Sequence, residues 1–328
     1  MFGKIVIAEA AVAILALVFL NSPIHALNAV ASIKQADGQV RIERGKEPKK
    51  VLIGRSGLIL NDRDIVTTGN RSKATILFRD GSEIRLFQKT SFEISQSMEG
   101  TASNGRRFIS RILLKFGSFW GKFAEGKQKT IVQTPTVTAE IEETIVGFSE
   151  SNGRFSAGVS AGMVEIGNDD ERFRLKAGRM VENVSRTGSI ADKIADLPYR
   201  LQIDPNRQKL SLPNPGETTS INFILQLAKA KTNENVHKSG AVYISAESDK
   251  ITFPRNVRLN ARGYARVQVA VHPFQKRDYK NGRIEITATM DGEDFIGVDA
   301  GEALVVYDVP KNLRGTVRID GSSGSIRQ

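Results

Sequence analysis

Cysteine is absent from the 328-residue sequence. This absence excludes disulfide bonds, thiolate metal sites and cysteine nucleophiles. Histidine is also scarce, because His25 lies in the N-terminal apolar region and only His237 and His272 remain beyond it. His237 lies in a polar loop and His272 at the end of an expected strand, and neither stands beside an obvious nucleophile. The residue type most often used in acid–base catalysis and metal binding is therefore nearly missing.

Motifs of enzyme chemistry give no clear site. We do not expect Ser156 or Ser160 to be the nucleophile of a G-x-S-x-G elbow. The acidic runs at 62–64, 168–171 and 291–294 lack the alternating carboxylates and distal glutamate of an EF-hand-type calcium loop. The sequence therefore predicts a protein that is not an enzyme and that uses no cofactor or metal. A carboxylate pair contributed by distant strands, as in a polysaccharide hydrolase, is the one enzyme hypothesis left open.

No apolar run reaches the roughly 20 residues that span a bilayer. The longest run, residues 10–20 (AAVAILALVFL), follows a weakly positive start, and Glu9 interrupts its extension backwards. A short apolar core with an A-x-A exit is typical of a secretory signal peptide. We expect a signal peptide over 1–31, cleaved after Ala31 or, as the second candidate, after Ala26. The alternative is an uncleaved segment that anchors the chain in the inner membrane.

Basic residues exceed acidic ones, since 47 Lys and Arg against 36 Asp and Glu give a net charge of +11. Such an excess favours anionic partners. Export to the periplasm or cell surface would separate the chain from nucleic acid, which leaves lipid phosphates, glycans or an acidic protein face. Cations lie beside aromatic residues over 105–129, and the candidate partner- or anion-binding residues are Arg106, Arg107, Arg111, Lys115, Trp120, Lys122, Lys127 and Lys129. The alternative for this stretch is a pair of strands with the aromatic rings in the core and the cations in solvent.

Short strands separated by turn signals fill most of the chain. Residues 73–88 (KATILFRDGSEIRLFQ) contain two alternating runs around Asp80-Gly81, which predicts a half-buried hairpin with a tight turn. Similar runs from Ala31 to Arg186 predict an all-β roll or sandwich. The best helix candidate covers 189–197 and ends before a proline.

A second domain is expected after a proline-rich connector at 204–216. Beyond it, about seven strands over roughly ninety residues match the scale of an immunoglobulin-like sandwich. The predicted organisation is a signal peptide over 1–31, a β domain over 32–186, a short helix and linker over 187–216, an Ig-like β-sandwich over 217–309 and a disordered tail over 310–328.

The first domain contains three ordered motifs, at 37–40 (DGQV), 65–69 (IVTTG) and 74–86 (ATILFRDGSEIRL). In this order they resemble the G-x-V, G-D-x-I-x-T-G and A-x-L-x-L-x-D-G-S-x-I-x-L stretches of the FecR domain family. The family's later landmarks are matched at 117–120 (GSFW), 132–135 (VQTP), 162–164 (GMV) and 176–178 (KAG). The resemblance covers about 31–184 and implies an all-β module of the periplasmic sensor type.

Two departures from the family pattern qualify what the resemblance implies. The family usually has R-G-T before a strand that follows its Thr-Pro, whereas Glu142-Glu143-Thr144 stands there in this chain. The regulators that give the family its name carry a cytoplasmic segment that binds a sigma factor. Only residues 1–4 precede the apolar run when it is extended back to Ile5, so we expect no direct sigma-factor control.

Three functions are compatible with these observations. The leading hypothesis is a non-catalytic exported protein of the cell envelope whose FecR-like module binds a protein partner, through exposed strand edges, in a signalling or scaffold role. The second is electrostatic adhesion to anionic lipid or glycan through the basic stretch, which salt would weaken. The third is an envelope polysaccharide hydrolase.

Overall fold

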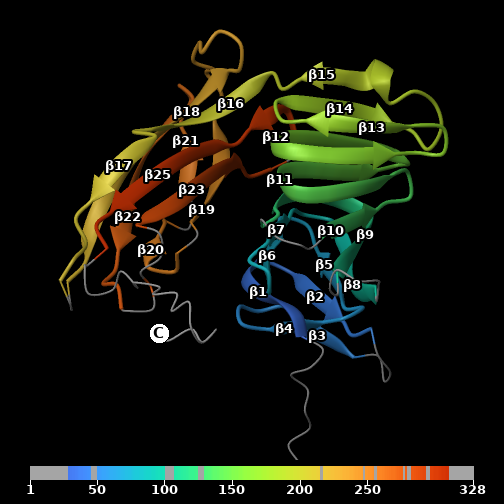
Figure 1. The fold of residues 1–328 in the computed structure, drawn as a ribbon, viewed down its shortest axis with the longest axis horizontal. Helices are drawn as coiled ribbons and strands as arrows, with labels where there is room; N and C mark the ends of the chain where they lie inside the picture. Colours follow the sequence, from blue (N-terminus) through green and yellow to red (C-terminus); the bar gives the residue numbers. More distant parts are fainter. Residues whose placement is uncertain are drawn as a thin grey trace, which may run out of the picture.

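The computed structural model describes residues 29–45, 50–99, 107–124, 129–214, 217–246, 248–254, 257–275, 278, 282–292 and 296–309. As the alternating runs predict, the fold is almost entirely β. A curled stack of strands forms the N-terminal half, and a sandwich of two sheets lies beside it (Figure 1). The expected signal peptide up to residue 28 and the expected tail from residue 310 lie outside the described residues. Within the described residues, no helix is long and apolar enough to cross a membrane.

The N-terminal domain is a single 15-stranded sheet whose main path runs β15-β14-β12-β11-β10-β9-β7-β6-β1-β4. The remaining strands, β2, β3, β5, β8 and β13, pair beside this path. Almost every pairing is antiparallel, and β9 and β10 form a parallel pair. The strands are β1 (Ala29–Asp37), β2 (Val40–Glu43), β3 (Val51–Ile53), β4 (Ile59–Asn61), β5 (Ile65–Thr68), β6 (Lys73–Phe78), β7 (Glu83–Leu86), β8 (Ser91–Glu99), β9 (Arg107–Lys122), β10 (Lys129–Gln133), β11 (Thr138–Ser151), β12 (Arg154–Gly167), β13 (Arg172–Lys176), β14 (Arg179–Val184) and β15 (Ile194–Asp196).

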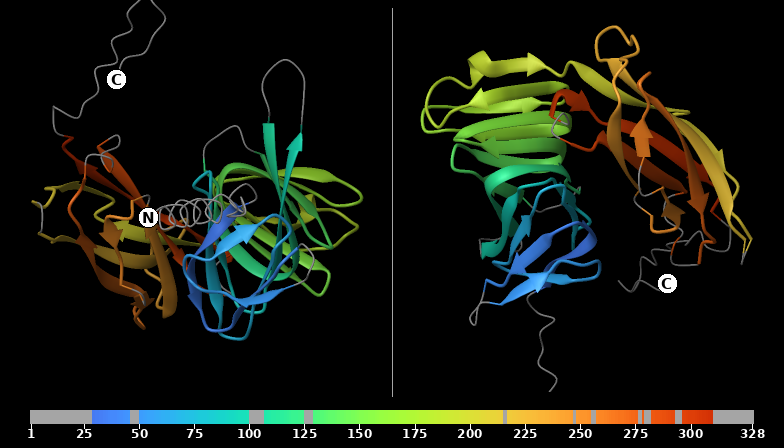
Figure 2. Two further views of the ribbon diagram at one scale, coloured as in Figure 1. Left: turned by 90° about the horizontal axis from the view of Figure 1, so that it is seen from below. Right: turned by 180° about the vertical axis from the view of Figure 1, so that it is seen from behind.

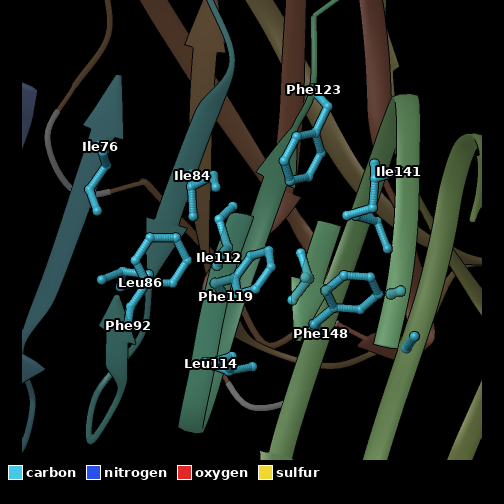
Figure 3. Packing of buried hydrophobic residues seen from close by; sticks show 14 of the residues in the cluster. Ile76, Ile84, Leu86, Phe92, Ile112, Leu114, Phe119, Phe123, Ile141 and Phe148 are labelled. Carbon is cyan, nitrogen blue, oxygen red and sulfur yellow. The ribbon is translucent and has the colours of Figure 1, made fainter. Parts of the chain in front are cut away.

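The apolar faces of these strands share one core. Phe119 lies between Phe92 and Phe148, with ring centroids 5.7 and 5.3 Å apart and the rings nearly perpendicular (Figure 3). All three rings are fully buried. Edge-to-face contacts of this kind add about 1 kcal/mol each beyond the burial of area. The aromatic residues of β8, β9 and β11 therefore pack these three strands together in the core.

The hairpin predicted over 73–88 is confirmed as β6 and β7, with Ile76 opposite Ile84 and Gly81 at a φ of 90° in the turn. Its expected half-burial is wrong, because all four residues of β7 are buried. The face that carries Glu83 and Arg85 lies against the C-terminal domain rather than in solvent. Sequence alternation reports which residues share a face, but it does not report what a second domain covers.

The C-terminal domain consists of two five-stranded sheets. One contains β20 (Ile251–Thr252), β22 (Tyr264–Val271), β18 (Thr219–Lys229), β16 (Tyr199–Asp204) and β24 (Val298–Asp299). The other contains β17 (Arg207–Leu210), β25 (Gly301–Tyr307), β23 (Arg283–Met290), β19 (Gly240–Ala246) and β21 (Val257–Leu259). Both sheets contribute to one core that includes Phe223, Val269, Ile286 and Val305. The immunoglobulin-like character of this sandwich stays a prediction.

Two expectations between the domains are wrong. The helix predicted over 189–197 is a single 3-10 turn, η2 (Ala191–Lys193), because the chain then pairs with β14 as β15. The expected linker instead contains β16 and β17, since Leu201, Ile203 and Leu210 are buried in the sandwich core. Pro205 lies in the bend between β16 and β17.

Candidate functional site: the interdomain cleft

A buried ion pair joins the polar face of β7 to the C-terminal domain. The Arg85 guanidinium donates to both carboxylate oxygens of Asp291, at 3.0 and 3.1 Å, and its third nitrogen donates to Thr75 Oγ1 at 2.9 Å. The same guanidinium lies 4.0 Å above the ring centroid of Tyr243. Lys73 Nζ is 2.6 Å from Asp291. Burial alone would raise the pKa of Asp291, but hydrogen bonds and charges from Arg85 and Lys73 outweigh it and hold that pKa below its ordinary value.

A second contact lies beside the first. The Tyr243 hydroxyl donates to Glu83 Oε1 at 2.6 Å, and Lys34 Nζ donates to the other carboxylate oxygen at 2.6 Å. Burial and the neighbouring Glu83 charge raise the pKa of Tyr243, so its hydroxyl stays protonated and donates. The Trp120 ring packs edge-on against Tyr243, with centroids 6.2 Å apart. Arg85, Asp291, Glu83, Tyr243 and their neighbours thus form a fixed joint between the domains.

Close backbone packing extends this joint along β12. A Cβ added at Gly158 would lie 2.1 Å from the Ile296 carbonyl oxygen, so glycine allows the two chains to meet. Two residues further on, Ser160 Oγ accepts a hydrogen bond from the Ala300 amide at 2.9 Å. Residues 158–162 (GVSAG) have the G-x-S-x-G spacing of a nucleophile elbow. They lie inside an extended strand rather than at a strand-to-helix turn, so the run serves packing and not a nucleophile elbow.

A cleft of about 1890 Å³ opens beside the joint. Its walls come from the β6–β7 turn, β11 and β12 of the N-terminal domain and from β19 and the segment after β20 of the C-terminal domain. The ribbons of the two domains lie side by side in both views of Figure 2. Exposed apolar side chains are present on its N-terminal wall, where Leu77 is 37% and Met163 is 41% exposed. Half-buried Ile244 and Phe253 line the opposite wall.

The cleft is acidic although the chain is basic. Twelve carboxylate side chains and six cationic side chains line it. Lys34, Arg85, Lys122, Lys129 and Arg174 each form an ion pair with an acid of the same lining. Lys73, Lys250 and Arg172, which lie outside the lining, also pair with its acids, and acids still outnumber all of these cations. The acids include Glu142 and Glu143, the residues that depart from the R-G-T pattern. A concave surface of one sign concentrates the field and attracts the opposite charge.

The basic stretch proposed from the sequence does not form one surface among the described residues. Arg106 and Lys127 lie outside them, as does the side chain of Arg107. Arg111 and Lys115 are exposed on β9, where Lys115 pairs with Glu93 at 3.3 Å.

The other three candidates lie near the joint. Trp120 is buried there, whereas Lys122 and Lys129 line the cleft, paired with Glu285 and Glu140 respectively. Partner binding by these eight residues stays a prediction. The charged residues Glu83 and Arg85, at alternate positions of β7, were the signal for the joint in the sequence. No sequence pattern near them identified Tyr243 or Asp291 as their partners.

Among the described residues, no group of three or more His, Cys, Asp and Glu side chains is arranged to hold a metal ion.

Comparison with known proteins identifies part of the chain. Residues 64–165 match the family described as FecR protein. Two crystal structures of a candidate anti-sigma factor from Parabacteroides distasonis, at 1.65 and 2.50 Å resolution, each show 13% identity and a TM-score of 0.31. The similar region covers 40% of this chain and 57% of that protein's chain, little more than half its length. No curated protein matches. The matched residues run from the start of β5 into β12, and the chain thus carries a FecR-family domain in its N-terminal half.

Proposed function

We propose that this chain is a non-catalytic, exported protein of the cell envelope that binds a protein partner in its interdomain cleft, in a signalling or scaffold role. The FecR family supports a regulatory module rather than an enzyme. The observation that carries the proposal is the excess of twelve acids over six cations in the cleft of a chain whose net charge is +11. The partner that fits is a basic segment of protein.

Size favours a polypeptide over a small ligand. The cleft volume of about 1890 Å³ exceeds the roughly 300–1,000 Å³ typical of small-molecule pockets. Exposed Leu77 and Met163 offer apolar contacts between the acids, so an extended segment with alternating basic and aliphatic residues would satisfy both kinds of surface. Charge complementarity of this type chiefly sets the association rate and the choice of partner.

Neutralising the cleft tests the proposal. The cleft variant changes three exposed acids that line the cleft: Glu143→Gln, Asp249→Asn and Glu302→Gln. The matched control changes three exposed acids elsewhere: Glu182→Gln, Asp192→Asn and Glu217→Gln. Each chain is cross-linked in its native cell, recovered, and analysed by mass spectrometry for what it carries.

We expect the wild type and the control variant to recover the same basic protein. The cleft variant should recover about tenfold less of it, which corresponds to a loss of about 1.4 kcal/mol in binding free energy. Equal recovery by the two variants would contradict partner binding in the cleft. Recovery of lipid or glycan without protein would instead support electrostatic adhesion.

A further inference from the structure

The end of the N-terminal domain that carries β3 and β4 exposes aliphatic side chains. Val51 and Ile53 of β3 are 62% and 82% exposed, and Ile59 of β4 is 47% exposed. Both are edge strands within the described part of the chain, where β3 pairs with β2 and β4 pairs with β1. Single exposed apolar residues are ordinary, but these three lie on two edge strands at the same end of the domain. We call Val51, Ile53 and Ile59 the aliphatic tip.

Hydrogen bonds hold the two edge strands together. Arg44 closes the β2–β3 hairpin by donating its amide to the Lys50 carbonyl at 2.9 Å, and its side chain donates to the Ile59 carbonyl at 3.1 Å. The buried Asp64 carboxylate accepts from Arg44, from the Gly45 amide at 3.3 Å and from the Asn61 amide at 2.8 Å. The aliphatic tip is therefore part of the folded domain.

The described chain begins at this same end. Ala29, the first residue of β1, pairs with Asn61, and Asn61 is bonded to the Asp64 carboxylate that also holds the β2–β3 hairpin. Ala29 thus lies at the end of the domain that carries the exposed aliphatic side chains, the end that Figure 1 shows furthest from β16 and β18.

The polar side chains around the aliphatic tip are mainly cationic. Arg41 and Lys50 are exposed beside β3, and Arg44 and Arg55 line a hollow of about 570 Å³ together with Ile59. Glu43 is an exposed acid here, whereas Asp64 is buried and paired with Arg44. Aliphatic side chains flanked by Lys and Arg suit the interface of an anionic bilayer, where the apolar side chains are buried among the headgroups and the cations attract lipid phosphates.

We propose that the aliphatic tip rests on the anionic lipid surface of a membrane. Val51, Ile53 and Ile59 enter the headgroup region, and Arg41, Lys50 and Arg55 contact lipid phosphates. The residues of this contact belong neither to the basic stretch at 105–129 nor to the lining of the interdomain cleft. The contact would fix the orientation of the domain on the membrane and leave the cleft free for its partner.

The lack of cysteine makes a direct test available, because a single introduced cysteine is labelled uniquely. Three variants of the mature chain, beginning at Leu27, carry Ile53→Cys, Ile59→Cys or the matched control Ile224→Cys, a residue 39% exposed on β18 of the other domain. Each is labelled with an environment-sensitive fluorophore. Each is then mixed with vesicles of about three parts phosphatidylcholine to one part phosphatidylglycerol, with a spin-labelled lipid as shallow quencher.

We expect the labels at 53 and 59 to be quenched at least about twofold more than the label at 224. Equal quenching at all three positions would overturn the proposal. Quenching that is unchanged in vesicles without phosphatidylglycerol would overturn the role of the cations. A blue shift of the label at 53 in the absence of vesicles would assign the aliphatic tip to a second copy of the chain and also overturn the proposal.

Discussion

Arg85 has a contact for every part of its guanidinium: the Asp291 carboxylate, the Thr75 hydroxyl and the Tyr243 ring. Its side chain is only 5% exposed, so removal of any partner would leave a buried charge incompletely satisfied. The planar fork of arginine suits this bidentate and stacked arrangement better than a lysine ammonium would. At the residue scale, the joint between the domains depends on this one side chain and its acid.

The Asp291→Asn substitution should weaken the folded state. It removes one partner of a buried, hydrogen-bonded ion pair, so we expect the free energy of unfolding to fall by about 3 kcal/mol, measured by urea denaturation. The control is Asp308→Asn, whose partner Lys209 forms a pair exposed on both sides. A loss below about 1 kcal/mol is expected there. Equal losses in the two variants would show that the buried pair has no special importance.

The same carboxylate predicts a dependence on pH. The folded pKa of Asp291 is lowered, so its contribution to stability is present above the pKa of the unfolded chain and is lost as pH falls through the folded value. The difference in unfolding free energy between the wild type and Asp291→Asn should therefore be constant near neutral pH and shrink below about pH 4. Chemical denaturation across that range measures it. A difference that grows in acid would contradict the assigned pairing.

At the scale of elements, alternation in the sequence predicted which side chains share a face, but it did not predict what covers each face. The hairpin at 73–88 was predictable because Ile76, Ile84 and the Asp80-Gly81 turn are local signals. The strands β16 and β17 were not, since prolines and polar residues dominate 204–216 and the burial of Leu210 arises from distant β25. Long-range pairing decided these segments.

Strand β12 has a position where any side chain should disturb the joint. Gly158→Ala would place a Cβ 2.1 Å from the Ile296 carbonyl oxygen, a backbone atom that cannot rotate away. We expect a loss of roughly 2 kcal/mol in the free energy of unfolding, measured by thermal or urea denaturation. Gly292→Ala is the control, because nothing lies within 4 Å of its added Cβ. A loss no larger than in this control would show that the domains do not meet closely at β12.

Strand β1 bears on where an N-terminal signal would end. Val30 and Ala31 are buried, and Ala31 pairs with both Leu60 and Phe78, so cleavage after Ala31 would remove the first three residues of a core strand. We therefore expect a mature N-terminus upstream of Ala29, which favours the Ala26 candidate over Ala31. Mass spectrometry of the protein recovered from its native cell determines this end. A mature chain beginning at Ser32 would contradict the expectation.

At the scale of the whole molecule, the two domains meet through residues that are far apart in sequence. Arg85 and Asp291 are separated by 206 positions, and Glu83 and Tyr243 by 160. The all-β class and the FecR-like span were predictable from ordered local motifs. The acidic cleft was not predictable, because residues of both domains contribute its charge. The sequence alone shows only that the whole chain is basic. Among the predicted binding residues, Lys122 and Lys129 reach the cleft, but there they are paired with acids.

Photo-cross-linking in living cells tests the central claim most directly. A photoreactive phenylalanine replaces Met163 on the cleft wall in one strain, and Phe116 on β9, 51% exposed beside Lys115, in another. The acidic cleft predicts a protein adduct from position 163 and none from position 116. An adduct from position 116 alone would place the partner on the basic stretch instead. Adducts of lipid or glycan alone at position 163 would contradict protein binding in the cleft.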